Sequence, residues 1–409
     1  MSEELQSGQV LDALKSVVDP DFRQDIVALG MAKGVAIADG RVAFTLELPT
    51  PAHPARERLK EQAEAALAAL PGVTGVDITV TANVKSVTRP EHGKTPLPGV
   101  KNVIAVGAGK GGVGKTTVSV NLALALAQMG AKVGILDGDV YGPNVPLMFG
   151  LTAELGTDGQ KIAPAEKYGV QIVSMAFMAN DDQALIWRGP MLHTAIRQFF
   201  TDVAWKDLDY LIIDMPPGTG DVALSLSQTV QVAGAVVITT PQVVSLADTR
   251  RAVRMYEKLS IPPLGLVENM SYYACPNCHI ESDIFGHGGG EQLASDMNVP
   301  FLGRLPVYQP IRVSGDRGIP LVVAEPNSPA GRGFFHLAER VAIRAAVSAH
   351  ENAIKHKGKI PLMQVRYGRG SGLARQGLGA CKTGAWDSGL GARACQRPTA
   401  KRLFGESCG

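Results

Sequence analysis

The 409-residue chain is long enough for two domains, and its 45% hydrophobic and 19% charged residues are typical of a globular protein. Its net charge of +2 is too small for a general electrostatic attraction to nucleic acid or membranes. The acidic start, Met1-Ser2-Glu3-Glu4, is not followed by an apolar signal segment, and the apolar runs are shorter than a membrane span. We therefore expect a cytoplasmic protein with no membrane partner and no specific nucleic-acid partner.

The first region, residues 1–84, is predicted to be a small α+β domain. Its apolar residues recur at helical spacing in two stretches and alternate with polar residues in two others. The expected elements are helices near Val10–Val18 and over Pro54–Leu70, and strands at Arg41–Leu48 and Val76–Val80. Residues 85–99 are polar and contain three prolines, which is typical of a linker.

The second region, residues 100–350, alternates short apolar strands with helical stretches. Strands are expected at Val103–Val106, Val133–Leu136, Tyr210–Ile213, Ala235–Thr239 and Leu264–Val267. This alternation predicts an α/β fold, with a mainly parallel sheet and helices on both faces. In such sheets ligands bind beyond the carboxyl ends of the strands.

A phosphate-binding loop follows the first of these strands. Its residues Gly109-Lys110-Gly111-Gly112-Val113-Gly114-Lys115-Thr116-Thr117 fit the pattern G-x-x-x-x-G-K-S/T between a strand and a helix. The glycines let backbone N–H groups surround phosphates, and the helix N-terminus adds its positive dipole. We expect Lys115 to reach the β- and γ-phosphates and Thr116 to bind Mg²⁺. An ordinary phosphate loop has no need of the second lysine, Lys110.

Acidic residues follow two further strands. Asp137 and Asp139 come after Val133–Leu136, and Asp214 comes after Tyr210–Ile213. Carboxylates at strand ends beside a phosphate loop can bind Mg²⁺ and position the attacking water. Asp214 has the form of a Walker-B acid, and the glycines that follow it suit a loop that moves when the γ-phosphate leaves.

A C-x-x-C pair, Cys275 and Cys278, follows the last expected strand. Its two thiolates can bind one metal but do not complete a tetrahedral site. The possible completions are the tail cysteines Cys381, Cys395 and Cys408, a local zinc site with His279 and His287, or the same pair from a second subunit around a [4Fe-4S] cluster. The tail cysteines are poor candidates because their spacing is irregular. A haem-attachment or thioredoxin-like role fits this context poorly.

The third region, residues 351–409, is rich in Gly, Arg and Ala and has no sustained period. We expect it to be disordered. It could serve as a nucleic-acid-binding arm or have no specific role.

Together these residues resemble one family, the Mrp/ApbC iron–sulfur cluster carrier ATPases of the deviant Walker-A group, which includes MinD, ParA and the nitrogenase iron protein. The resemblance covers about Val100 to Ala345. It rests on Gly109–Thr117, Asp137–Pro146, Asp214–Asp221, Glu268–Ser271 with Cys275 and Cys278, and Phe285–Glu291. The C-x-x-C pair distinguishes the carriers from the positioning ATPases.

The N-terminal region resembles the small domain of the MIP-eighteen family, found with iron–sulfur assembly proteins. The matching stretches are Asp19–Asp21, Ile26–Gly30 and Thr50–Pro54. The chain has His53 where single-domain relatives often have cysteine.

The resemblance implies a homodimeric ATPase that uses ATP and Mg²⁺, holds a [4Fe-4S] cluster between its subunits, and works with scaffold proteins and apoproteins. It implies that Lys115 and the loop backbone bind the phosphates, that Thr116 binds Mg²⁺, and that Lys110 contacts the nucleotide of the other subunit. Asp139 would orient the attacking water, and Asp137 and Asp214 would support the metal ion and the switch loops. Asn269 would contact adenine, and Cys275 and Cys278 would bind the cluster. The alternatives are a MinD- or ParA-like positioning ATPase with a structural zinc site, and an electron donor like the nitrogenase iron protein.

Overall fold

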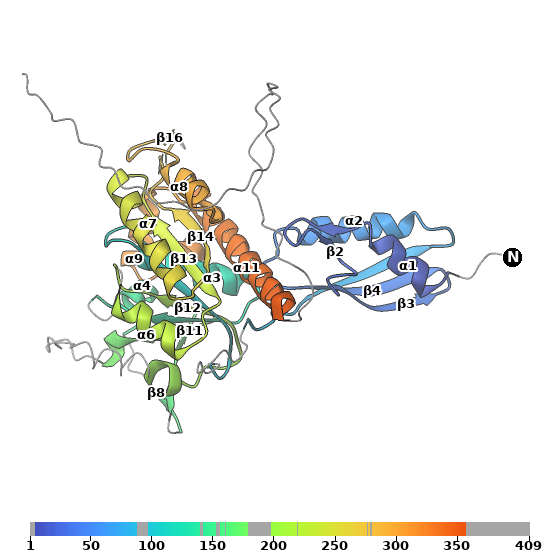
Figure 1. Cartoon of the computed structure of the whole chain (residues 1–409), viewed down its shortest axis with the longest axis horizontal. Helices are drawn as coiled ribbons and strands as arrows, with labels where there is room; N and C mark the ends of the chain where they lie inside the picture. Colours follow the sequence, from blue (N-terminus) through green and yellow to red (C-terminus); the bar gives the residue numbers. More distant parts are fainter. Residues whose placement is uncertain are drawn as a thin grey trace, which may run out of the picture. The chain divides into compact units, whose positions relative to one another are not determined.

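The computed structural model describes residues 5–87, 97–139, 142–152, 156–159, 161–178, 198–218, 220–275, 277–278 and 280–356 (Figure 1). His279, most of the predicted linker, and nearly all of the predicted tail with its three cysteines lie outside these residues. Within the described ranges, no helix is both long enough and apolar enough to span a bilayer.

An eight-stranded sheet forms the centre of the second region. Its order is β10-β11-β7-β12-β6-β13-β14-β17, and neighbouring strands are parallel except for the β10–β11 pair. The strands are β6 (Val100–Ala108), β7 (Val133–Asp137), β10 (Ala165–Lys167), β11 (Val170–Ser174), β12 (Leu208–Asp214), β13 (Gly234–Thr239), β14 (Pro263–Glu268) and β17 (Phe301–Arg304). The predicted α/β fold is confirmed, and all five predicted strands are present. The short strands β10, β11 and β17 were not predicted.

Helices cover both faces of this sheet (Figure 1). Along β12, Tyr210 and Ile212 pack in the core with α3 (Lys115–Gln128) and α11 (Pro329–His356). Leu211 and Ile213 point to the other face, whose core includes residues from α6 (Asp221–Thr229), α7 (Val243–Lys258) and α8 (Gly289–Met297). This period of two follows from the alternation of side chains along a strand. Both faces are apolar because both are covered.

Shorter elements complete the second region. They are α4 (Val145–Phe149), α9 (Gln309–Asp316), α10 (Leu321–Ala324), the 3₁₀ turn η1 (Met175–Met178), and the hairpin strands β8 (Gly156–Asp158), β9 (Lys161–Ala163), β15 (Tyr273–Ala274) and β16 (Glu281–Ser282). The hairpin β15–β16 carries the cysteine pair and begins a few residues after the carboxyl end of β14.

The small domain has its own core beneath a three-stranded sheet. It contains α1 (Ser7–Leu14), β1 (Val18–Asp19), β2 (Gln24–Asp25), β3 (Ala32–Ala38), β4 (Arg41–Leu48), α2 (Arg56–Ala68) and β5 (Gly75–Ala82). The prediction of a helix to Val18 is wrong, since α1 ends at Leu14 and Val18–Asp19 pairs with β2. Pro20 disfavours helical backbone in the residue before it.

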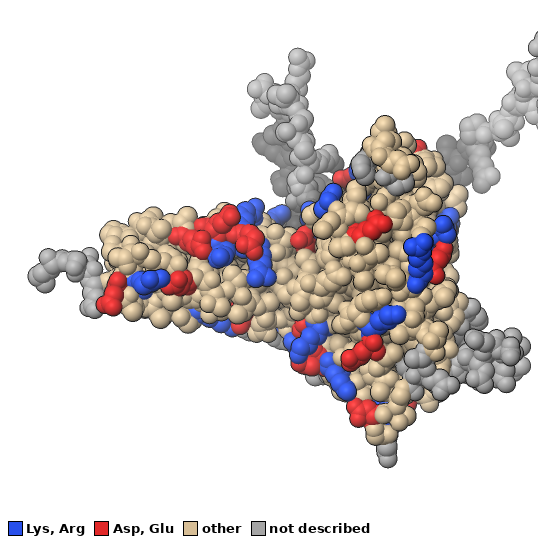
Figure 2. Space-filling view, turned by 180° about the vertical axis from the view of Figure 1, so that it is seen from behind, with Lys and Arg blue, Asp and Glu red and all other residues tan. Residues whose placement is uncertain are grey.

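On the face of the molecule shown in Figure 2, acidic and basic side chains lie interspersed.

A buried contact between a histidine and an aspartate lies inside the small domain. His53 Nε2 is 3.0 Å from Asp19 Oδ2, and neither side chain is exposed. The backbone N–H of Ala55 donates to His53 Nδ1 at 3.2 Å, so the hydrogen-bond pattern places the imidazole proton on Nε2. Burial raises the pKa of Asp19, but hydrogen bonds from His53 and from the N–H groups of Phe22 and Asp21 lower it overall. His53 thus accepts a hydrogen bond from the turn before α2 and lies with Nε2 against the buried carboxylate of Asp19.

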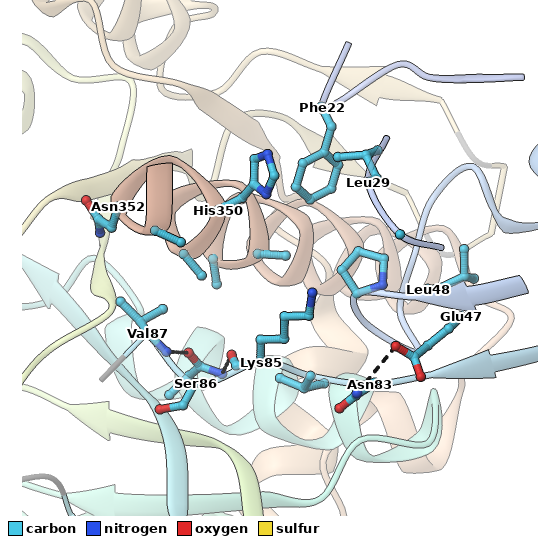
Figure 3. Close-up of a pocket in the computed structure, with 18 of the residues that line it drawn as sticks. Phe22, Leu29, Glu47, Leu48, Asn83, Lys85, Ser86, Val87, His350 and Asn352 are labelled. Carbon is cyan, nitrogen blue, oxygen red and sulfur yellow. Dashed lines mark hydrogen bonds between the residues drawn. The ribbon is translucent and has the colours of Figure 1, made fainter. Parts of the chain in front are cut away.

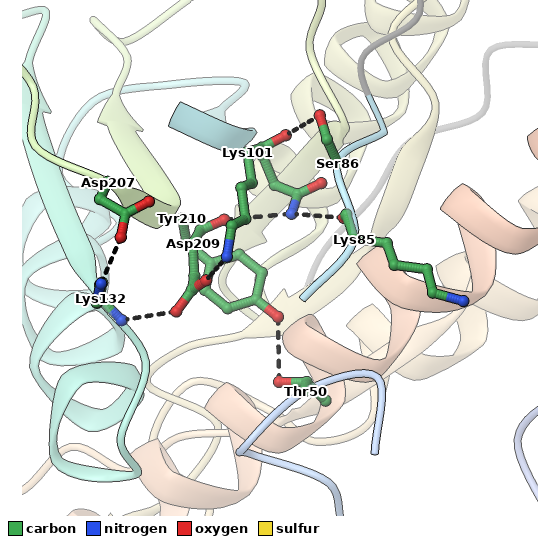
Figure 4. A network of polar contacts seen from close by, with 9 residues as sticks. Thr50, Lys85, Ser86, Lys101, Lys132, Asp207, Asp209 and Tyr210 are labelled. Carbon is green, nitrogen blue, oxygen red and sulfur yellow. Dashed lines mark hydrogen bonds and ion pairs between the residues drawn. The ribbon is translucent and has the colours of Figure 1, made fainter. Parts of the chain in front are cut away.

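The small domain contacts the amino-terminal ends of β6 and β12 (Figure 4). The hydroxyl of Tyr210 donates to Thr50 Oγ1 at 3.1 Å, and both residues are buried. The side-chain amide of Asn102 donates to the carbonyls of Lys85 and Asp209 at 3.1 and 3.2 Å. The first residues of the predicted linker are therefore fixed to the sheet.

A cavity of about 390 Å³ lies beside this contact (Figure 3). The small domain contributes Phe22 and Leu48 to its wall, and α11 contributes His350. Burial and the charge of Lys85 lower the pKa of His350. Since Asn102 and Tyr210 also line it, the cavity lies at the opposite end of the sheet from the phosphate loop.

Candidate functional site

The phosphate loop connects the carboxyl end of β6 to α3. Gly112 and Gly114 have φ angles of +78° and +81°, which L side chains rarely adopt. At Gly109 a Cβ atom would lie 2.3 Å from the carbonyl carbon of Asp248 and 2.7 Å from the nitrogen of Thr249. The loop therefore needs glycine at these positions for conformation or for space.

The lysine and threonine at the end of the loop both contact Asp214. Lys115 Nζ is 2.7 Å from Asp214 Oδ2, and the Thr116 hydroxyl donates to the same oxygen at 2.7 Å. The hydroxyl of Ser119 donates to Asp214 Oδ1 at 2.6 Å. Lys115 and Asp214 are buried, so their opposite charges compensate each other in a poorly solvated position.

A second carboxylate, Asp137, lies beside Asp214. The two aspartates are partners in the parallel pair β7–β12, and Asp137 is fully buried. Burial and the negative charge of Asp214 raise the pKa of Asp137 to about 7. The N–H of Val145 and the hydroxyl of Ser174 donate to Asp137 Oδ2 at 3.1 and 3.0 Å. The sheet thus brings together two of the predicted acidic residues with Lys115 and Thr116.

Of the other two predicted catalytic residues, Asp139 contacts this centre and Lys110 lies in the phosphate loop. The N–H of Asp139 donates to Asp137 Oδ1 at 3.1 Å, and the Asp139 side chain is half-buried. Lys110 is also half-buried, and it forms no ion pair with any residue that the structure describes. Val140, Tyr141 and Thr219, in the two loops after the acidic strands, lie outside the described residues.

Asn269, the residue that follows β14, contacts the phosphate loop. Its side-chain amide donates to the carbonyl of Val113 at 2.8 Å, and its N–H donates to the carbonyl of Thr239 at 2.9 Å. A Cβ atom on Gly114 would lie 2.4 Å from the Asn269 nitrogen, so this contact also depends on glycine.

The cysteine pair lies on the β15–β16 hairpin, which is closed by pairing of Tyr273 with Ser282. Cys275 is half-buried and Cys278 is exposed. The N–H groups of Cys278 and Asn277, followed by the Cys278 thiol, lower the pKa of Cys275. Such hydrogen bonds favour the thiolate, which is the form that binds metals.

Within the described ranges, no three His, Cys, Asp or Glu side chains come together as metal ligands. His287, one of the two histidines proposed for a zinc site, is 3.6 Å from Asp283 and 3.5 Å from Arg304. The other, His279, is outside the described residues.

Several polar residues of the site were missed by the sequence analysis. Ser119 and Ser174 hold the two aspartates, and Glu268 accepts a hydrogen bond from Ser271 at 2.6 Å. A signal existed for Ser119, because it lies one helical turn after Lys115 and so shares its face. No sequence signal exists for Ser174, whose strand is far along the chain.

Two family models match the chain. Residues 99–342 match the model described as NUBPL iron-transfer P-loop NTPase. Residues 8–80 match the model described as iron–sulfur cluster assembly protein.

Similar proteins include the iron–sulfur cluster carrier protein of Synechocystis sp., which is 46% identical over 84% of this chain and 99% of that protein. The carrier protein of Escherichia coli K12 is 42% identical over 83% of this chain and 93% of its own length. Among solved structures, the nucleotide-binding protein of Archaeoglobus fulgidus in complex with ADP is 37% identical, with a TM-score of 0.51 over 58% of this chain and 93% of that one.

Proposed function

Since the chain belongs to the NUBPL family of iron-transfer P-loop NTPases, and is thus an ATPase of the iron–sulfur cluster carrier class, we propose that it carries a [4Fe-4S] cluster and transfers it to apoproteins. The observation that supports the proposal is that the phosphate loop and the cysteine hairpin are joined through Asn269. Asn269 contacts the phosphate loop, and the hairpin with Cys275 and Cys278 begins four residues later. Nucleotide and cluster would therefore bind at the same edge of the sheet.

The cluster would be shared between two subunits. Two thiolates per chain supply half of the four ligands that a cubane cluster needs. A two-fold axis beside the hairpin would bring two pairs together, as in isologous dimers. The same dimer would let Lys110, half-buried and without an ion pair among the described residues, reach the nucleotide of the other subunit.

The nucleotide would be bound by the residues that now surround Asp214. Lys115 would turn from Asp214 to the β- and γ-phosphates, and Asn269 would contact adenine. Thr116, Asp137 and Asp214 offer the hard oxygen ligands that Mg²⁺ prefers, so these residues fit the metal. Bound there, Mg²⁺ would neutralise charge on the phosphates. Asp139 would orient the attacking water.

We place this activity in the cytoplasm, with scaffold proteins as sources of clusters and apoproteins as recipients. We assign the nucleotide and the cysteine pair to residues 100–350. Residues 1–84 would be an accessory domain that contacts the sheet through Thr50.

The test is removal of the cysteine ligands. The Cys275→Ala and Cys278→Ala variants should each bind no cluster after anaerobic reconstitution but keep wild-type nucleotide affinity, because the hairpin lies outside the phosphate loop. Cys381→Ala is the matched control and should keep the cluster. A Cys275→Ala protein with a full iron–sulfur absorbance spectrum would contradict the ligand assignment.

A further inference from the structure

One buried carboxylate holds together both stems of the cysteine hairpin. Glu268, the last residue of β14, has no exposed surface. Its Oε1 accepts the Ser271 hydroxyl at 2.6 Å, just before the hairpin. After the hairpin, the N–H of Gly288 donates to Oε1 at 3.3 Å, and the N–H of Gly290 donates to Oε2. Residues 272–287, which include both cysteines, are thus bracketed by hydrogen bonds to one side chain.

The glycine-rich segment after the hairpin is shaped around this carboxylate. Gly288 has a φ of +73° and is the N-cap of α8, so Glu268 also lies at the positive end of a nine-residue helix. A Cβ atom on Gly290 would lie 2.9 Å from Glu268 Oε2, and one on Gly289 would lie 2.6 Å from Leu246 Cδ1. The motif Phe285–Glu291, which the sequence analysis used only as a mark of the family resemblance, thus contains the glycines that bind Glu268.

The same strand end also contacts the nucleotide site. Asn269, the next residue after Glu268, donates to the carbonyl of Val113 in the phosphate loop at 2.8 Å. The carbonyl of Glu268 accepts the N–H of Leu305 at 2.9 Å, and the N–H of Ser271 donates to the carbonyl of Leu305 at 3.0 Å. The backbone that joins the phosphate loop to the hairpin is therefore fixed on both sides.

We propose that Glu268 is a positioning residue. It fixes the cysteine hairpin at the strand end that contacts the phosphate loop, so that a bound nucleotide changes the reactivity of the cysteine pair. This inference rests on the proposed function, in which both sites act together. Glu268 touches neither nucleotide nor cluster in this account, and it acts through Ser271, Gly288 and Gly290.

The test compares E268Q with a matched control, E291Q. A carboxamide at position 268 cannot accept from all three donors, since its NH₂ group donates. Glu291 lies in the first turn of the same helix, but its side chain is 55% exposed and pairs with Arg304. E291Q therefore removes a charge near the same helix end without touching the buried hydrogen bonds.

Two quantities are measured on the full-length protein without cluster. The first is the rate of hydrogen–deuterium exchange in peptides within residues 272–287. This rate should be about tenfold faster in E268Q, which is the size expected for loss of a charge-assisted hydrogen bond. It should be unchanged in E291Q. The second is alkylation of Cys275, read by peptide mass spectrometry with and without Mg-ADP. ADP should change the wild-type rate at least about threefold, an effect that E268Q loses while keeping ADP affinity within about twofold.

Several results would overturn the inference: exchange in E268Q equal to that in E291Q, an ADP effect on Cys275 that survives in E268Q, or no ADP effect in the wild type. If E268Q does not fold, the S271A variant provides the test, since it removes one of the hydrogen bonds to Glu268. It should show the same two changes, in exchange rate and in the ADP effect on Cys275, but smaller than those expected for E268Q. A wild-type protein that takes up no iron or sulfide would contradict the proposed function instead, and would leave these two measurements valid.

Discussion

The carboxylate of Asp214 contacts Lys115, Thr116 and Ser119. A buried lysine without this partner would carry an uncompensated charge. The sequence identified Lys115, Thr116 and Asp214 from a local pattern, because a phosphate loop and a strand-end acid are each contiguous in the chain. The direct pairing of Lys115 with Asp214 was not predicted, since it joins the first residue of α3 to the last residue of β12.

Replacing Lys115 by methionine should lower the rate of ATP hydrolysis by on the order of 10²–10³, the loss typical of one preorganised charge at the reacting phosphates. Cluster content after reconstitution should stay at the wild-type level. Lys132→Met is the matched control, because Lys132 lies in the same domain and is exposed beside Asp207. Unchanged turnover in the Lys115 variant, measured as phosphate release, would refute the assignment of the loop.

The raised pKa of Asp137 predicts a pH-dependent stability for the nucleotide-free protein. An unfolded aspartate loses its proton near pH 4, whereas burial and Asp214 keep Asp137 protonated to about pH 7. The folded state therefore binds more protons in this window, and the contribution of Asp137 to stability falls as the pH rises from about 4 to about 7.

The Asp137→Asn variant does not titrate, so it should gain stability relative to the wild type across this window. The gain should reach on the order of 4 kcal/mol by neutral pH. Urea unfolding at several pH values between 4.5 and 8 measures the difference. A constant difference between the two proteins would show that Asp137 titrates normally.

At the scale of elements, the phosphate loop depends on how closely its backbone approaches neighbouring chain segments. Substituting Gly109 by alanine puts a methyl group 2.4 Å from the carbonyl oxygen of Asp248 in α7. At Gly111 the nearest atom to a new Cβ is 3.9 Å away, on Pro217. Gly109 is a fixed position of the sequence pattern and Gly111 is a variable one, which agrees with the difference in packing.

Gly109→Ala should therefore destabilise the nucleotide-free protein by about 1–3 kcal/mol, the usual cost of overpacking. Gly111→Ala should leave the stability within about 0.5 kcal/mol. Thermal melting of the two variants beside the wild type provides the comparison. Equal melting temperatures for both variants would contradict the packing argument.

The elements predicted correctly were those with strong local periodicity, such as β4, whose Val42, Phe44, Leu46 and Leu48 alternate in burial. The missed strands of the central sheet, β10, β11 and β17, have three to five residues, and the missed strand β3 of the small domain has seven, with no strict alternation of burial. The Glu268–Gly290 contact was missed because it joins positions on either side of the cysteine hairpin. Sequence patterns predict candidate site residues, and tertiary structure shows which side chains these residues contact.

At the scale of the whole molecule, the small domain contacts the end of the sheet opposite the phosphate loop. Tyr210 lies at the start of β12 and Asp214 at its end, so one strand runs from the small domain to the nucleotide site. The described contact of the small domain with β12 is thus at the other end of this strand from Asp214.

Tyr210→Phe should lower the stability by about 1 kcal/mol, the net value of a buried hydrogen bond, and lower the melting temperature by roughly 2–4 °C. Tyr308→Phe is the control, since its hydrogen bond to Glu325 is exposed and should contribute less. Differential scanning calorimetry measures both. A larger loss in the Tyr308 variant than in the Tyr210 variant would contradict the importance of the Thr50 contact.

The central claim is that the cysteine pairs of two subunits hold one cluster. The most direct measurement is anaerobic reconstitution of the wild-type protein, followed by iron, sulfide and zinc analysis per chain and determination of its mass in solution. The account predicts a dimer with about four iron and four sulfide and a broad absorbance band near ~400 nm. About one zinc per chain without sulfide would instead make the pair a structural site and contradict the account.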